Sequence, residues 1–208
     1  MKTKKYHFTQ KEISHLAISV LVMSFVVAYS MISGTVSGFI ETGTAIVVTM
    51  PASFVIIAPA FVLHELGHKL TSQRFGFQAE YRMWTQGLLF ALLITIMSGG
   101  SFIFVAPGAV YFGGGTRKAS LEHTAKIGIS GPLVNLMLAG VFGSIAVITS
   151  GTIGMIGSYG AYVNAWLAIF NLIPFGPLDG EKILKWNKKV WGAAMFLGIA
   201  VFIGSMFI

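Results

Sequence analysis

The sequence contains no cysteine, a single aspartate and few charged residues of either sign. Without cysteine, disulfides and thiolate metal sites are excluded, so any metal must bind His, Asp or Glu. Only 10% of the 208 residues are charged and 55% are hydrophobic, whereas soluble domains carry about a quarter charged residues. Several apolar runs approach 20 residues, enough to cross a hydrocarbon core about 30 Å thick. The composition therefore predicts a multi-pass, all-α membrane protein embedded in a lipid bilayer.

The net charge of +7 comes from basic residues that lie in clusters beside the apolar runs. This is the pattern of cytoplasmic loops that retain Lys and Arg, so it predicts topology and no nucleic-acid partner. The clusters are Lys2, Lys4, Lys5 and Lys11; Lys69, Arg74 and Arg82; Arg117, Lys118 and Lys126; and Lys182, Lys185, Lys188 and Lys189.

Five apolar runs are clear candidates for membrane spans. The first follows the basic N-terminus directly and is longer than the apolar core of a signal peptide, so we expect it to be a retained span. Loops 34–43 and 150–151 contain no Lys or Arg and should face away from the cytoplasm. The N-terminus and all four basic clusters then face the cytoplasm. The predicted spans are approximately 13–33, 44–70, 124–149, 152–175 and 190–208.

Residues 87–115 hold a sixth apolar run, but Arg82 and Arg117 flank it on both sides. A single crossing would put one of these charges on the wrong side of the membrane. The pair Gly99-Gly100 can turn the chain back, and Pro107 breaks the part that follows. We therefore expect a re-entrant segment or a β-hairpin that packs against protein, since unpaired backbone cannot face lipid. It would give a fold of five to six membrane helices.

The second span ends in the motif H-E-x-x-H, formed by His64, Glu65 and His68. Two histidines four residues apart project from one face of a helix and can bind one zinc ion. Glu65 beside them can take a proton from metal-bound water. Charged groups inside a span cost about 2.5–3.5 kcal/mol each, which a metal would offset. The alternative is that the histidines merely lie at the membrane interface.

A zinc site of this kind needs a third protein ligand and leaves the fourth position open. Asp179, the one aspartate, lies after a helix broken by Pro174 and Pro177 at the end of the fourth span. Broken helices at membrane depth occur where they line a cavity or are buried in protein. The motif and Asp179 lie on the same side of the membrane only if residues 87–115 do not cross it. A helix cap is the alternative role for Asp179, and Glu181 is the alternative ligand.

Three sequence elements together resemble the site-2 protease family of intramembrane zinc metalloproteases. They are HELGH at 64–68, GPLVN at 131–135 and NLIPFGPLDG at 171–180, in the order of the family. The resemblance implies that His64, His68 and Asp179 bind one Zn²⁺ per chain and that Glu65 is the catalytic base. It further implies that Asn171 holds substrate or the developing oxyanion, and that Gly131 and Asn135 line the core near the site.

We therefore expect a zinc metalloendopeptidase that cuts peptide bonds within or near transmembrane segments of other membrane proteins. Residues 1–208 are expected to form one membrane domain, with a core at about 44–186. Asn164, a polar residue within the fourth span, should hydrogen-bond between helices. The rival functions are a membrane metal transporter, which would need further ligands along its path, and an inactive protease-like binding protein. A related membrane protease with a glutamate as third ligand is a further alternative.

Overall fold

The computed structural model describes residues 8–33, 39–103, 107–113 and 118–208. It consists of seven helices and two strands within these ranges. By their contacts the residues divide into two units: the first contains Val62–Ala79 and Phe112–Ile208, and the second contains His7–Phe61 and Glu80–Tyr111. The two units are considered separately below.

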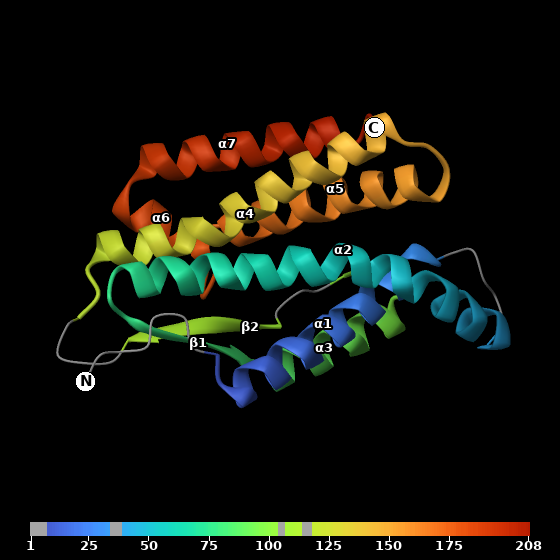
Figure 1. The fold of residues 1–208 in the computed structure, drawn as a ribbon, viewed down its shortest axis with the longest axis horizontal. Coiled ribbons are helices and arrows are strands. Elements are labelled where there is room, and N and C mark those ends of the chain that lie inside the picture. The colour runs from blue at the N-terminus through green and yellow to red at the C-terminus, as the bar shows by residue number, and fades with distance from the viewer. Residues whose placement is uncertain (1–7, 34–38, 104–106, 114–117) are drawn as a thin grey trace. The chain divides into compact units, whose positions relative to one another are not determined.

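The first unit is helical and carries α4 (Leu121–Ile148), α5 (Gly151–Leu172), α6 (Asp179–Trp186) and α7 (Lys188–Ser205). It also contains the C-terminal part of α2 (Phe39–Arg74). Helices α4 and α5 are joined by two residues and run side by side in opposite directions (Figure 1). Apolar side chains on their outer faces, such as Val147 and Met155, are largely exposed, as expected of residues that face lipid.

A small apolar core fixes the short helix α6 between α5 and α7. Leu172 at the end of α5, Ile183 in α6 and Ala194 in α7 form one buried cluster. The indole Nε1 of Trp191 in α7 donates a hydrogen bond of 2.8 Å to the backbone carbonyl of Leu172. Because these contacts hold α6 against α5, they also determine where its first residue, Asp179, lies.

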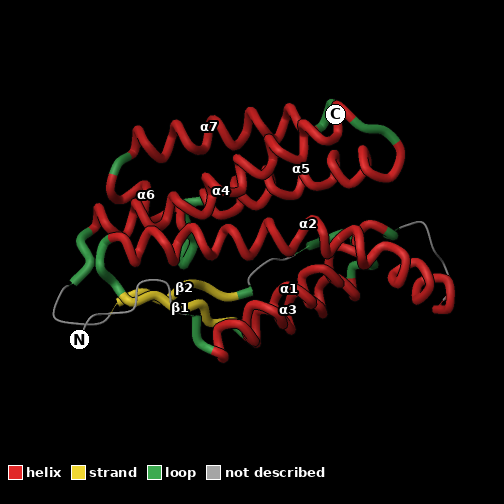
Figure 2. Tube along the Cα trace, viewed as in Figure 1, coloured by secondary structure: helices red, strands yellow, loops and turns green. Residues whose placement is uncertain are grey.

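The second unit combines helices with a two-stranded sheet. It holds α1 (Gln10–Met31), the N-terminal part of α2 and α3 (Thr85–Met97), and most of β1 (Gln78–Met83) and β2 (Gly108–Gly113), which pair with each other (Figure 2). Tyr81 of β1 is buried, and its hydroxyl donates to the carbonyl of Pro107 and accepts from Ser19 of α1. The carboxylate of the buried Glu12 in α1 accepts from the backbone N–H of Tyr81. These bonds attach the sheet to α1.

Five of the described helices, α1, α2, α4, α5 and α7, are long and apolar enough to cross a membrane. They match the five predicted spans, which confirms a multi-pass membrane protein. Their bounds differ from the prediction by a few residues, mostly where polar residues such as Thr9 and Ser120 cap a helix earlier.

The segment 87–115, expected to be a re-entrant segment or a β-hairpin, forms a short helix followed by one strand of a two-stranded sheet. Its apolar run forms α3, whose 13 residues rise about 20 Å, less than the roughly 30 Å of a hydrocarbon core. The turn predicted at Gly99-Gly100 is present, with φ of 62° and 84°. The strand β2 follows, and its partner β1 lies before residue 87, outside the predicted segment. Residues 104–106 and 114–117 lie outside the described residues.

Candidate metal centre

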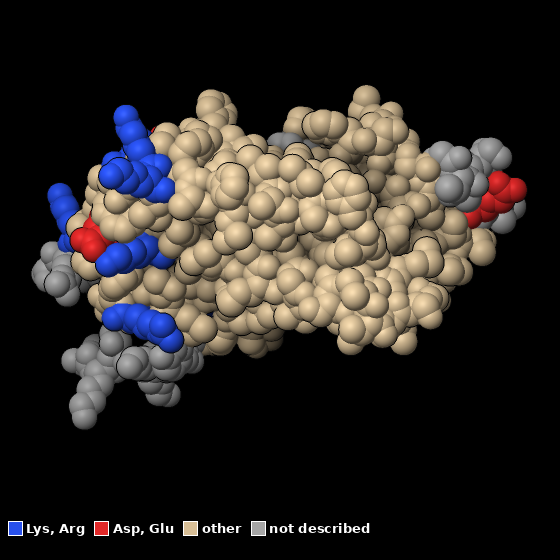
Figure 3. Space-filling model, turned by 90° about the horizontal axis from the view of Figure 1, so that it is seen from above, with Lys and Arg blue, Asp and Glu red and all other residues tan. Residues whose placement is uncertain are grey.

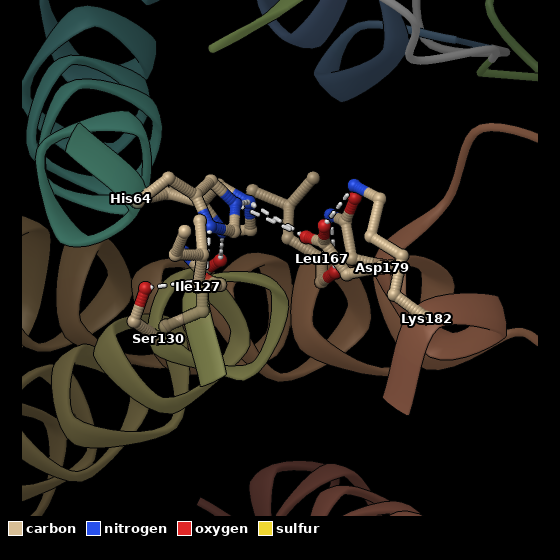
Figure 4. A network of polar contacts seen from close by, with 9 residues as sticks. His64, Ile127, Ser130, Leu167, Asp179 and Lys182 are labelled. Carbon is tan, nitrogen blue, oxygen red and sulfur yellow. Dashed lines mark hydrogen bonds and ion pairs between the residues drawn. The ribbon is translucent and has the colours of Figure 1, made fainter. Parts of the chain in front are cut away.

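His64 and His68 lie one turn apart on α2, as the H-E-x-x-H spacing predicts, and Asp179 begins α6. All three side chains are buried and their ligand atoms converge, although His68 and Asp179 are 111 residues apart in the chain. Figure 4 shows His64 and Asp179 facing each other from α2 and α6. Among the described residues, these three form the one group of three or more His, Cys, Asp or Glu side chains with convergent ligand atoms. The structure therefore brings together the three residues that the sequence predicted as metal ligands.

The distances within this cluster leave room for one metal ion. The Nε2 atoms of His64 and His68 are 3.0 Å apart, and Oδ2 of Asp179 lies 3.0 Å from His68 Nε2 and 3.8 Å from His64 Nε2. In a tetrahedral zinc site with bonds of about 2.0–2.1 Å, ligand atoms are about 3.3 Å apart. For the observed triangle, a point exists about 2 Å from all three atoms, the length of a zinc bond to nitrogen or oxygen.

The other ring nitrogen of each histidine makes a hydrogen bond that leaves Nε2 free for a metal. His68 Nδ1 lies 2.7 Å from the backbone carbonyl of Ile127 in α4. A carbonyl only accepts, so Nδ1 must carry a proton, and Nε2 of the neutral ring then presents its lone pair. His64 Nδ1 contacts Oδ1 of Asn135, also in α4. Such outer partners orient ligating histidines in metal sites.

Asp179 presents one carboxylate oxygen to the histidines and the other to a lysine. Oδ1 accepts a hydrogen bond of 2.9 Å from the ammonium of Lys182, one turn further along α6 (Figure 4). Burial alone would raise the pKa of the Asp179 carboxyl. The charge and hydrogen bond of His68, with the charges of Lys182 and His64, outweigh burial and hold this pKa well below its usual range.

Two glycines allow the elements of the site to approach one another. Gly131 of α4 faces both Nε2 atoms, and a Cβ at this position would collide with the imidazoles of His64 and His68. A Cβ on Gly180 would overlap the carbonyl oxygen of Leu172 at the end of α5. Any residue with a side chain at these positions would displace the histidines or Asp179, so the close packing of the site requires glycine at both.

Glu65 is buried beside the two histidines, and its Oε2 has no hydrogen-bond partner among the described residues. A buried, unpaired carboxylate oxygen is costly and usually marks a functional site or a bound water. The alternative ligand Glu181 lies elsewhere: it is partly exposed and pairs with Lys185 at 2.7 Å. The geometry therefore favours Asp179 over Glu181 as the third ligand.

The remaining predicted residues differ in how they relate to the cluster. Asn135 is fully buried and contacts His64. The sequence placed Asn135 near the site but did not predict this contact with His64. Asn171 is half-buried, and its Nδ2 donates to the carbonyl of Leu167 in its own helix. Its contact with substrate stays a prediction. The prediction that Asn164 bonds between helices is confirmed, because Asn135 Nδ2 donates to Asn164 Oδ1 at 3.0 Å.

Two further contacts of the site were not predicted from the sequence. They are the bond from His68 to the carbonyl of Ile127 and the ion pair of Lys182 with Asp179. The first involves only backbone on the α4 side and leaves no signal in the residue types. The second had a signal, since Lys182 lies three residues after Asp179, a spacing at which helical side chains meet.

Comparison with known proteins places this geometry in a class. The chain is 35% identical over 190 residues to "Putative zinc metalloprotease MJ0611" of Methanocaldococcus jannaschii, covering 89% of this chain and 90% of that protein. It is 28% identical over 178 residues to "Putative zinc metalloprotease Rip3" of Mycobacterium tuberculosis, covering 80% of this chain and 39% of the relative. "Zinc metalloprotease MJ0392" of M. jannaschii is 28% identical over 138 residues, covering 64% of this chain and 33% of that protein. No protein-family model and no solved structure matches.

The extensive similarity to the first relative, together with the His-His-Asp cluster, defines a zinc metalloprotease with several membrane-spanning helices. The chain belongs to the site-2 protease family. The resemblance drawn from its three sequence motifs is thereby confirmed.

Proposed function

We propose that this protein is an intramembrane protease that hydrolyses peptide bonds within or near transmembrane segments, using one zinc ion held by His64, His68 and Asp179. The observation that carries the proposal is the convergence of these three buried side chains beside Glu65, whose Oε2 has no hydrogen-bond partner among the described residues. His64 lies ten residues before the end of α2, about 15 Å along a helix that is long enough to span the membrane. A site on a membrane-spanning helix is suited to substrates that are themselves in the bilayer.

In the proposed reaction, each residue has a separate role. When bound, zinc polarises a peptide carbonyl and makes water acidic enough to lose a proton near neutral pH. Glu65 takes the water proton on its unpaired Oε2 and later returns it to the leaving amine. Lys182 holds the second oxygen of Asp179, so that the carboxylate offers one oxygen at the cluster. Asn171, at the end of α5, is proposed to hold the substrate backbone.

The substrate helix must unwind locally before it can be cut, because its carbonyls are hydrogen-bonded and shielded by neighbouring turns. Purified protein in detergent should therefore cut a single-span test segment that contains Gly or Pro faster than a Leu-rich segment of equal length. Equal rates for the two segments would refute this substrate class.

Zinc content measured on the same preparations should be about one ion per wild-type chain and greatly reduced in His64→Ala and Asp179→Ala. Zinc loss in His64→Ala alone would exclude Asp179 as a ligand.

The active-site end is proposed to face the cytoplasm. Exposed lysines of the first unit gather at the end where α4 and α7 begin, as positive-inside topology requires (Figure 3). The absence of cysteine makes a direct test simple. Lys185→Cys in α6 and Thr152→Cys at the start of α5 place one exposed thiol at each end. In intact cells an impermeant thiol reagent should label Thr152→Cys and leave Lys185→Cys unlabelled until the membrane is opened. The reverse pattern would invert the proposed orientation.

The metal-transporter alternative requires further ligands along a path through the membrane. Within the described part of the chain, the His64, His68 and Asp179 cluster is the one such group, and the relatives named above are metalloproteases by name. An inactive binding protein would also hold zinc, so cleavage by wild type with none by Glu65→Gln is the measurement that separates it from a protease.

A further inference from the structure

The two histidines of the site fix their ring tautomers in different ways. His68 donates directly to a backbone carbonyl, which can only accept. His64 instead contacts the side-chain amide of Asn135, and an amide can present either its oxygen or its NH₂ group. If Asn135 presented NH₂, His64 would carry its proton on Nε2 and could not bind a metal there. Something beyond Asn135 must determine which way this amide points.

A chain of buried amides determines that direction. Asn135 Nδ2 donates to Oδ1 of Asn164 in α5 at 3.0 Å, and Asn164 Nδ2 donates to the backbone carbonyl of Gly160 at 2.9 Å. Asn135 and Asn164 are both fully buried. The carbonyl of Gly160 only accepts, so Asn164 must turn its NH₂ toward it and its oxygen toward Asn135. Asn135 must then turn its own oxygen toward His64, which places the imidazole proton on Nδ1.

We propose that Asn164 is a positioning residue for the metal site: through Asn135, it holds His64 in the tautomer that presents Nε2 to the metal. The proposal rests on the proposed zinc site and adds a residue whose hydrogen bonds run to Asn135 and to the carbonyl of Gly160. It assigns Asn135 to the orientation of His64. The chain of hydrogen bonds connects α2, α4 and α5. Helix α5, which carries Asn164, supplies none of the three proposed ligands but orients one of them, His64.

Substitution at position 164 provides the test by zinc affinity. Asn164→Leu removes the acceptor for Asn135 Nδ2, and with it the bond that sets the direction of this amide, so we expect zinc affinity to fall by about 10- to 100-fold, as for other outer-shell losses. In Asn164→Asp, a protonated carboxyl accepts from Asn135 with its carbonyl and donates to Gly160 with its hydroxyl, so affinity should stay within a few-fold of wild type. Ser158→Ala, which removes a similar bond to a carbonyl in α5, should have no effect.

A double-mutant cycle and a direct readout of the tautomer distinguish positioning from general damage to the helices. In an Asn135→Leu background, Asn164→Leu should cause no further loss of zinc affinity, because the chain is already broken. NMR of zinc-free protein with ¹⁵N-labelled histidine should show His64 protonated on Nδ1 in wild type, with Nε2–H appearing in Asn164→Leu.

Each outcome decides the proposal. It is overturned if Asn164→Leu binds zinc within twofold of wild type, if Asn164→Asp loses as much affinity as Asn164→Leu, or if wild-type His64 carries its proton on Nε2. The NMR measurement on wild type decides the question even if Asn164→Leu fails to fold. Failure of the proposed zinc site is a separate result: wild type itself would then bind no zinc, whatever the variants do.

Discussion

The ammonium of Lys182 lies 2.9 Å from Oδ1 of Asp179, while Oδ2 of the same carboxylate lies 3.0 Å from His68. The aspartate is thus held from both sides, and the lysine limits rotation of the carboxylate. This pair is half-buried on the lysine side, unlike an exposed surface ion pair, whose contribution is commonly about 0–1 kcal/mol.

Removal of the lysine charge should therefore weaken the metal site. Lys182→Met frees one oxygen of Asp179, and we expect zinc affinity, measured by competition with a chromophoric chelator, to fall about 10-fold or more. Lys182→Arg should retain most of the affinity. The control is Lys185→Met, which breaks the more exposed pair with Glu181 on the same helix and should leave zinc affinity unchanged. Equal losses in the two methionine variants would show that the ion pair with Asp179 has no special role.

Glu65→Gln should separate metal binding from catalysis. Glutamine keeps the size of the side chain and contributes no proton acceptor of comparable basicity, so cleavage of a test segment should fall by about 10²- to 10⁴-fold. Zinc content should remain that of wild type, because Glu65 is not among the three convergent ligands. Loss of zinc from Glu65→Gln would instead make Glu65 a ligand.

Gly180→Ala should disturb the site through the backbone. The added Cβ meets the carbonyl of Leu172 and must push the start of α6, and therefore Asp179, away from the histidines. Overpacking of this kind costs about 1–3 kcal/mol, and we expect zinc affinity to fall at least 10-fold. Gly192→Ala in α7 is the matched control, since a Cβ there meets nothing within 4 Å. Its stability, followed by thermal unfolding in detergent, should be unchanged or slightly raised.

Chelation of the metal should lower thermal stability. A ligand at 100 times its dissociation constant stabilises the folded state by about 2.7 kcal/mol, so unfolding of the wild type should shift to lower temperature when zinc is removed and recover when it is returned. Asp179→Ala should show little dependence on zinc over the same range. An unfolding temperature of the wild type that is the same with and without zinc would contradict tight binding of the ion.

Much of the site could be predicted because its chemistry is local or rare. His64 and His68 need only the helical spacing of four residues, and Asp179 was the one aspartate available. The amide chain through Asn164 could not be predicted in direction, since it depends on how α4 and α5 rotate against each other and on the carbonyl of Gly160, which residue type does not reveal.

In the region of the sheet, too, a local feature could be predicted from the sequence and a long-range pairing could not. The glycine pair predicted the turn after α3, because positive φ is accessible to glycine at little cost. The strand Gln78–Met83 was not predicted as the partner of β2: it alternates polar and apolar residues, but it is only six residues long and carries both a Glu and an Arg. Its structure follows from a tertiary contact, the burial of Tyr81 between Ser19 and Pro107.

A single added methyl group at position 131 would block the space for the metal, although α4, which carries Gly131, supplies no ligand. An alanine methyl there would occupy space between the imidazoles, yet it would leave His64, His68, Asp179 and Glu65 chemically intact. Gly131→Ala would thus be a metal-free form with a complete set of ligands, whereas Glu65→Gln is a metal-loaded form without a base. Measured side by side for capture of a test segment, the two variants would tell whether the metal helps to recruit the substrate or acts only once the substrate has arrived.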